Sequence, residues 1–227
     1  MTALMVVGMI CAVCLIEYIR TKKSKQKELI LIKSMENSFK RRILPTEFNI
    51  PRGLFFSPNH LWLKILPCGD IQIGVDDFVQ KIIGKLDKIE IKNKKRIKKG
   101  EDLFTVYQNN KKLTFYSPID GKISEINKEI VENPDLLKNS LYEKGWILKI
   151  TPFDLQNVII ESNIDKNTYK WLLREVERLE DFLGYHNIYN KPAFLTLQDG
   201  KIKIEGLLEN FDDFAWMDFE EKFLKRR

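Results

Sequence analysis

The stretch Phe104–Gly121, FTVYQNNKKLTFYSPIDG, decides the fold class of this 227-residue chain. Two runs rich in β-branched and aromatic residues flank Asn109-Asn110, a pair that tolerates the positive φ of a tight turn. The pattern predicts a β-hairpin with Lys111 and Lys112 directly after the turn. A rigid hairpin can hold a lysine clear of the domain, so either lysine is a candidate attachment point for a cofactor.

Short strands and turns continue on both sides of this hairpin. Residues 61–65, 71–73 and 89–91 read as alternating strands, and PCGD and IDGK are turn sequences. A short helix is expected from Asp76 to Ile83, ending before Gly84. Many short strands with regular turns predict a mainly β domain, a sandwich or barrel, over residues 53–153.

Five segments of this domain carry a resemblance to a known family. They are, in chain order, SPNHLWLKI, IQIGVDDFVQKIIGKLDKIEI, IKKGEDLFTV, FYSPIDGKISEIN and NPDLLKNSLYEKGWILKI. Residues 55–153 resemble the H protein of the glycine cleavage system. The resemblance implies a lipoyl-domain-like fold, a barrel-sandwich hybrid of two sheets. It also implies a hairpin whose lysine carries lipoate through an amide bond, so that the arm shuttles an aminomethyl group and electrons between partner enzymes.

The hairpin departs from the family pattern at the residues that matter for lipoate. The family places its lysine in a Glu-Ser-x-Lys-Ala-like turn upstream of Tyr-Ser-Pro. Without gaps, the lysine position falls on Asn110 and the glutamate position on Tyr107; with one deletion, they fall on Lys111 and Gln108. Neither alignment supplies the acidic residue. The sequence therefore indicates a degenerate lipoylation site without cofactor, and lipoate on Lys111 (less so on Lys112) stays open as the alternative.

Composition and motifs narrow the function classes further. The apolar fraction of 44% is typical of a globular protein, and the net charge of +6 comes without an arginine-rich block or zinc-type Cys/His spacing, so nucleic-acid and metal binding are not expected. The chain has no nucleophile elbow, P-loop or dinucleotide fingerprint. His60 is more typical of a structural hydrogen bond than of catalysis. These observations predict a non-catalytic binding or carrier protein.

The N-terminus predicts a membrane anchor. Residues 1–19 form an apolar run that is just long enough to cross a bilayer as a helix. Five basic residues follow between Arg20 and Lys27, which by the positive-inside rule places the main domain in the cytoplasm and the N-terminus outside the inner membrane. A cleaved signal peptide is the rival interpretation, but no basic residue precedes the run. Residues 20–52 are expected to form a basic amphipathic helix, around 28–44, and a linker.

The last segment, residues 154–227, has no counterpart in the ordinary H protein. An apolar stripe predicts a helix from Asp165 to Leu183, and FLTLQ-DG-KIKIE at 194–204 predicts a hairpin. A final helix over 210–223 carries five aromatic residues, too many for a solvated helix. They either pack on the sandwich or form a docking surface for an unidentified protein partner. Together these features favour a membrane-anchored, non-lipoylated binding or scaffold subunit, with a functional lipoyl carrier as the alternative.

Overall fold

The structure is a computed structural model that describes residue 17 and residues 43–92, 94–164, 166–186 and 203–225. The described residues from Ile43 onward form one compact unit. The predicted anchor at residues 1–19 lies outside the described residues apart from Glu17, and so does the amphipathic helix at 28–44 apart from its last two residues. In the described part, no helix is both long and apolar enough to cross a bilayer.

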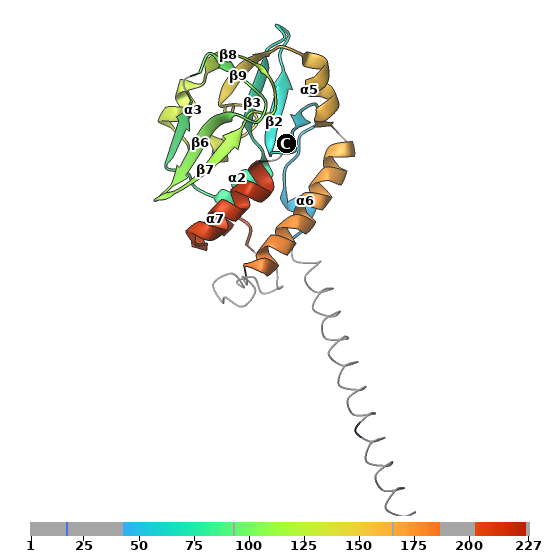
Figure 1. Cartoon of the computed structure of the whole chain (residues 1–227), viewed down its shortest axis with the longest axis vertical. Coiled ribbons are helices and arrows are strands. Elements are labelled where there is room, and N and C mark those ends of the chain that lie inside the picture. Colours follow the sequence, from blue (N-terminus) through green and yellow to red (C-terminus); the bar gives the residue numbers. More distant parts are fainter. Residues whose placement is uncertain (1–16, 18–42, 93, 165, 187–202, 226–227) are drawn as a thin grey trace, which may run out of the picture. The chain divides into compact units, whose positions relative to one another are not determined.

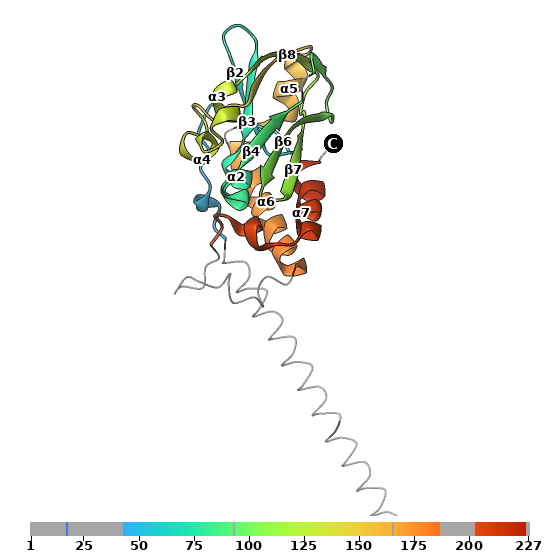
Figure 2. The ribbon, with the colours of Figure 1, turned by 90° about the vertical axis from the view of Figure 1, so that its left-hand side faces the viewer.

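Two antiparallel sheets form the sandwich that the sequence predicts (Figure 1, Figure 2). In the described residues, the larger sheet has the strand order β10-β1-β2-β3-β9-β8-β5 and the smaller one β4-β6-β7. The strands are β1 (Phe55–Phe56), β2 (Leu61–Ile65), β3 (Ile71–Val75), β4 (Lys88–Ile91), β5 (Arg96–Ile97), β6 (Asp102–Gln108), β7 (Lys111–Tyr116), β8 (Gly121–Ile126), β9 (Leu148–Pro152) and β10 (Asn163–Ile164). The mainly β fold class is thereby confirmed.

Apolar side chains from both sheets form the core. Leu63 of β2 pairs with Ile73 of β3, and both are fully buried. In the smaller sheet Phe104 pairs with Phe115, and their rings stack with centroids 4.7 Å apart. Each such side chain stabilises the fold by roughly 1.5–3 kcal/mol through burial. The alternation expected at 71–73 and 89–91 therefore has its physical cause in this core. Residues 61–65 do not alternate, because Leu61, Trp62 and Leu63 are all buried.

Helix α2 (Asp77–Ile83) lies where the sequence places it. Asp76 caps it, since its Oδ1 accepts a hydrogen bond from the Val79 amide at 2.9 Å. Gly84 ends it with a φ of +82°, which a side chain would disfavour. A Cβ on Gly84 would also lie 2.7 Å from the Cα of Gly206. The backbone at Gly206 therefore passes very close to the C-terminal end of α2.

The C-terminal extension is mainly helical in its described part, with one short strand, and packs on the sandwich (Figure 1, Figure 2). Its elements are α5 (Leu155–Glu161), β10, α6 (Lys166–Tyr185), the 3-10 turn η4 (Leu207–Asn210), α7 (Asp213–Phe219) and the π-helical turn η5 (Glu220–Leu224). The remaining short elements are η1 (Pro45–Glu47), α3 (Lys128–Glu132) and α4 (Leu136–Asn139). The sequence did not predict α5 or β10, and β10 adds a strand to the larger sheet beside β1.

The buried faces of α6 and α7 agree with the apolar stripes in the sequence. Leu172, Val176, Leu179 and Leu183 of α6 are all buried. The final helix starts at Asp213, three residues later than predicted, because the Asp212 side chain caps it by accepting from the Ala215 amide at 2.9 Å. The predicted hairpin at 194–204 lies almost wholly outside the described residues, which resume at Lys203.

Candidate functional site

The β6–β7 hairpin forms with the two-residue turn that the sequence predicts. Gln108 and Lys111 are the last paired residues, and Asn109 and Asn110 make the turn. Asn109 has a φ of +52°, a conformation that asparagine tolerates better than most residues. Its amide donates to the Asp87 carboxylate at 2.5 Å, which fixes the turn against the chain after α2.

The two residues that could replace the family glutamate point in opposite directions from β6. The Tyr107 hydroxyl reaches outward and donates to Glu90 Oε2 at 3.0 Å. Gln108 is buried, and its Nε2 lies 3.0 Å from the carbonyl oxygen of Ile83 and 2.6 Å from that of Lys85. These bonds require a donor. A glutamate at 108 would place carboxylate oxygens against two carbonyl oxygens, so this environment fits an amide and disfavours the acid.

Lys111 lies on β7 beside the turn and turns toward the extension. Its Nζ donates a hydrogen bond to the carbonyl oxygen of Phe211 and lies 5.7 Å from the centre of the Trp216 ring. A cation over an aromatic face and a carbonyl acceptor together hold the ammonium group in place. Lys112, the next residue, is exposed, as is Asn110 at the turn.

The same extension covers the free edge of the small sheet. β7 is the last strand of that sheet, so its outer amides need another partner. The Glu220 carboxylate supplies one: it accepts from the Thr114 amide at 2.8 Å and from the Tyr116 hydroxyl at 2.8 Å. Burial and Glu220 raise the pKa of Tyr116, so this hydroxyl keeps its proton and remains a donor.

A second junction, between the sandwich and α6, contains buried charge. His60 is fully buried, with Nδ1 2.8 Å from Asp76 Oδ2 and Nε2 3.5 Å from Glu175 Oε2. Burial alone would lower the pKa of His60, but the two carboxylates raise it to about 9. Arg178 extends the network, since its Nη1 lies 2.5 Å from Glu175 Oε2 and its guanidinium carbon lies 4.7 Å from the centre of the Phe223 ring.

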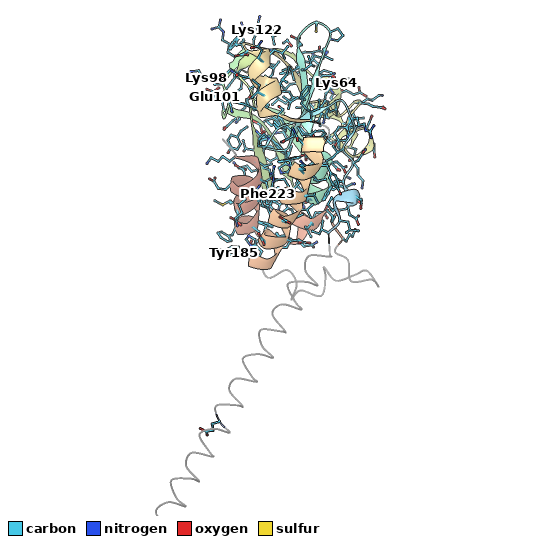
Figure 3. The ribbon with its side chains drawn as sticks, turned by 90° about the vertical axis from the view of Figure 1, so that its right-hand side faces the viewer. Lys64, Lys98, Glu101, Lys122, Tyr185 and Phe223 are labelled. Atoms are coloured by element: carbon cyan, nitrogen blue, oxygen red, sulfur yellow. The ribbon has the colours of Figure 1, made fainter. Side chains whose placement is uncertain are left out.

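His60 therefore has a structural position, with no access to a substrate from solvent. Its ring stacks on Phe78 at 4.6 Å and lies 6.0 Å from the ring of Phe223, which Figure 3 labels. Sequence reasoning did not pick out Glu175. The available signal was its place on the apolar stripe of α6, three residues after Leu172, where an acidic side chain needs a buried partner.

One cavity of about 250 Å³ lies between the turn after β7 and α5. Its polar wall groups include Asn59, whose Nδ2 donates to the Tyr116 carbonyl at 2.6 Å, and Lys99, whose Nζ pairs with Glu161 Oε2 at 2.7 Å. These wall groups already have partners. Among the described residues, no group of three or more His, Cys, Asp or Glu side chains could hold a metal ion.

Comparison with known families gives a match over the sandwich and the first half of α6. The family model described as Glycine cleavage H-protein matches residues 54–175, more than half of the chain. The chain belongs to the glycine cleavage H-protein family. The match begins just before β1 and ends at Glu175, so it includes the β6–β7 hairpin, while the residues that cover the hairpin (Phe211, Trp216 and Glu220) lie beyond it.

Several curated relatives agree with this assignment. A probable glycine cleavage system H protein of Thermococcus kodakarensis is 29% identical over 131 residues, which is 57% of this chain and 96% of the relative. The glycine cleavage system H protein of Halothermothrix orenii is 31% identical over 131 residues, 57% of this chain and 99% of the relative. The crystal structure of an H protein from Mycobacterium marinum has a TM-score of 0.42 and 22% identity, and the match covers 46% of this chain and 87% of that one.

Proposed function

We propose that this H-protein-family chain is a non-lipoylated module, anchored in the inner membrane by residues 1–19, that acts as a binding or scaffold subunit for another protein. H proteins of the family are carriers within the glycine cleavage system and not catalysts themselves, so a non-enzymatic role is consistent with the family. The anchor rests on the sequence, from the apolar run and the basic residues that follow it.

The observation that carries the proposal is the environment of Lys111. A lipoyl-bearing lysine needs a free amine that a ligase can reach and an arm that can swing. Here the Lys111 amine donates to the Phe211 carbonyl and lies against Trp216. Acylation would remove its positive charge and with it the cation–π contact. Lys111 in this arrangement therefore does not fit lipoate.

The residues around Lys111 support the same proposal. Gln108 uses its amide as a donor to two carbonyl groups, so the family glutamate has no place there. Glu220 covers the β7 edge, where an incoming protein would otherwise find open backbone amides. The hairpin is thus used to seat the extension, and binding of a partner falls to the outer surface of the molecule.

The alternative is a functional carrier with lipoate on Lys111. It is favoured by family membership and by the place of Lys111 directly after the turn. Mass spectrometry of the intact protein from its native host separates the two functions. The proposal expects an unmodified chain in cells whose other lipoyl proteins are modified. A lipoyl-sized mass increment that disappears in Lys111→Ala, with Lys112→Ala as the matched control, would establish the carrier instead.

The membrane topology is tested with Cys68, which is exposed in the turn between β2 and β3. In a Cys11→Ser, Cys14→Ser background, a membrane-impermeant thiol reagent should label Cys68 only after the cells are opened. Labelling of Cys68 in intact cells would place the domain outside and contradict the cytoplasmic location. Release of the protein from membranes by carbonate at high pH would contradict the anchor.

A further inference from the structure

A strongly basic segment lies on the outer side of the larger sheet. Residues 92–99, KNKKRIKK, contain six lysines or arginines and no acidic residue. β5 lies within this segment, and Arg96 of β5 pairs with Lys122 of β8. Both side chains are exposed, as is Lys98, and Figure 3 shows Lys98 and Lys122 at the end of the domain remote from Tyr185. Two cations are thus held directly opposite each other on neighbouring strands.

This like-charge pair is unfavourable in the free protein, because equal charges directly opposite each other in an antiparallel sheet repel. In the described part of the chain, no carboxylate pairs with Arg96, Lys98 or Lys122 to offset the repulsion. Lysines on an edge strand such as β5 commonly prevent sheets from adding to one another. That role does not explain Lys122, because β8 lies inside the sheet between β5 and β9. An anion bound between Arg96 and Lys122 would remove the repulsion.

An exposed aromatic ring borders the two cations. Lys122 pairs with Thr151 of β9, and the Phe153 amide donates to the Asp120 carbonyl at 3.1 Å, which continues the β8–β9 register by one more row. Because side chains alternate along a strand, Phe153 lies on the same side as Thr151 and diagonal to Lys122. Phe153 is 64% exposed, so its ring contributes little to the core. We give the name basic sheet face to Arg96, Lys98, Lys122 and Phe153.

Carboxylates limit the size of the basic sheet face. The Asp120 carboxylate accepts from the Lys99 amide at 2.8 Å, and the Asp70 carboxylate accepts from the Thr151 hydroxyl at 2.7 Å. Two further carboxylates form ion pairs with other lysines of the basic segment, Glu101 with Lys94 at 3.5 Å and Glu161 with Lys99 at 2.7 Å. A long polyanion or a flat anionic membrane would meet these carboxylates as well as the cations. A short acidic segment fits between them.

From this arrangement we infer that the basic sheet face binds a short acidic segment of a partner protein, with carboxylates on Arg96 and Lys122 and an apolar side chain on Phe153. The guanidinium of Arg96 can hold a carboxylate through two parallel hydrogen bonds. The exposed ring of Phe153 favours an apolar or aromatic side chain next to those carboxylates. The inference rests on the proposed binding function, for which it names the partner's chemistry.

The test uses the full chain in nanodiscs of neutral phosphatidylcholine and a synthetic peptide with one phenylalanine between two pairs of glutamates. Titration of the fluorescently labelled peptide, corrected with empty nanodiscs, gives the dissociation constant, and the Thr151 methyl resonance reports binding at the face itself. The other probes are the peptide with lysine in place of glutamate, the peptide with serine in place of phenylalanine, a single-stranded oligothymidine, and nanodiscs that contain phosphatidylserine.

The variants separate the charged and the apolar contributions. Arg96→Glu with Lys122→Glu should weaken binding of the acidic peptide by about tenfold or more, because repulsion replaces two charge-assisted contacts. Phe153→Ala should weaken it by about fivefold. The matched control is Lys64→Glu with Lys170→Glu, which changes the net charge equally at two exposed sites outside the basic sheet face. Lys122→Gln alone should leave the unfolding free energy unchanged or raise it, because it removes the like-charge neighbour of Arg96.

Several results would overturn the inference. These are equal affinity of wild type and the Arg96→Glu, Lys122→Glu variant, equal binding of the lysine or the serine peptide, and a Thr151 resonance that does not move. Tighter binding of the oligothymidine than of the acidic peptide would make the face a nucleic-acid site instead, and a Thr151 shift caused by phosphatidylserine alone would make it a membrane contact. A lipoyl mass increment, in contrast, would contradict the non-lipoylated function and leave the titration unchanged, so the two failures are distinguishable.

Discussion

Helices α6 and α7 both attach the C-terminal extension to the same sandwich, but they do so with different chemistry. α6 brings Glu175 to the buried imidazole of His60, so its attachment includes a charged network. α7 and η5 bring Trp216, Phe219 and Phe223 into the core and add Glu220 at the strand edge. The free energy that holds α6 on the sandwich therefore depends on pH, whereas that of α7 and η5 comes chiefly from apolar burial.

The largest effect is expected where α7 is anchored. Phe219→Ala removes a fully buried ring that contacts the rings of Phe182 and Phe223 at 5.8 and 4.7 Å. Unfolding free energy from denaturant titration should fall by about 3–5 kcal/mol, through lost burial and the cavity left behind. Phe214→Ala on the exposed side is the matched control and should change it by less than about 0.5 kcal/mol. Equal losses in both variants would mean that α7 does not have these two faces.

A somewhat smaller loss, about 3 kcal/mol, is expected from Glu175→Ala on α6. The change leaves the His60 imidazolium and Arg178 with one carboxylate fewer in a buried site. The control is Glu177→Ala, an exposed residue of the same helix, which should have almost no effect. If both substitutions gave the same small change in unfolding free energy, the buried network would not hold α6.

The pH dependence of stability should follow His60. The pKa of His60 is raised in the folded state from 6.5 to about 9, so the protonated ring favours folding. Its contribution is fully present below pH 6.5 and is lost as the pH rises through 9, with a slope of up to about 1.4 kcal/mol per pH unit. Denaturant titrations at several pH values between 6 and 10 measure this slope.

The control for that series is the second histidine. His60→Asn should flatten the slope, and the same series on His186→Asn separates the effect of His60 from that of the other histidine. Unfolding free energy that increases between pH 7 and 9 in the wild type would contradict a protonated His60. It would mean that burial lowers the pKa of His60 by more than the two carboxylates raise it.

The smallest effect is expected at Glu220, which covers the β7 edge of the hairpin. Glu220→Ala deprives the Thr114 amide and the Tyr116 hydroxyl of their shared acceptor, so unfolding free energy should fall by about 1–2 kcal/mol. Amide hydrogen exchange at Thr114 should become faster. Glu221→Ala, one residue on and exposed, serves as the control. Unchanged exchange at Thr114 in Glu220→Ala would show that the β7 edge has another protection.

Local sequence patterns predicted much of this molecule because short-range physics determines those parts. The alternation at 71–73, the Asn109-Asn110 turn, the short helix before Gly84 and the apolar stripe of α6 all depend on near neighbours, and all are confirmed. The alternation expected at 61–65 is wrong, because Leu61, Trp62 and Leu63 are all buried. The anchor at residues 1–19 and the hairpin at 194–204 stay predictions.

Long-range contacts could not be predicted in the same way. Lys111 meets Phe211 across 100 positions, and His60 meets Glu175 across a still longer separation. Nothing in either local sequence specifies the partner. For the same reason, the sequence left open whether the aromatic residues of the final helix pack on the sandwich or dock a partner. Trp216, Phe219 and Phe223 do the first, whereas Phe214 is 59% exposed.

The close approach at Gly84 has a consequence for how such an extension can be gained or transferred. The end of α2 lies so near the incoming segment that a Cβ on Gly84 would meet Glu209 Oε1 at 2.5 Å and the Cα of Gly206 at 2.7 Å. A tail of this kind therefore cannot simply be grafted onto any related sandwich. A related sandwich could accept this extension only if it already had a glycine at the end of the helix that corresponds to α2. A single residue of the sandwich thus limits which proteins can carry the whole C-terminal segment.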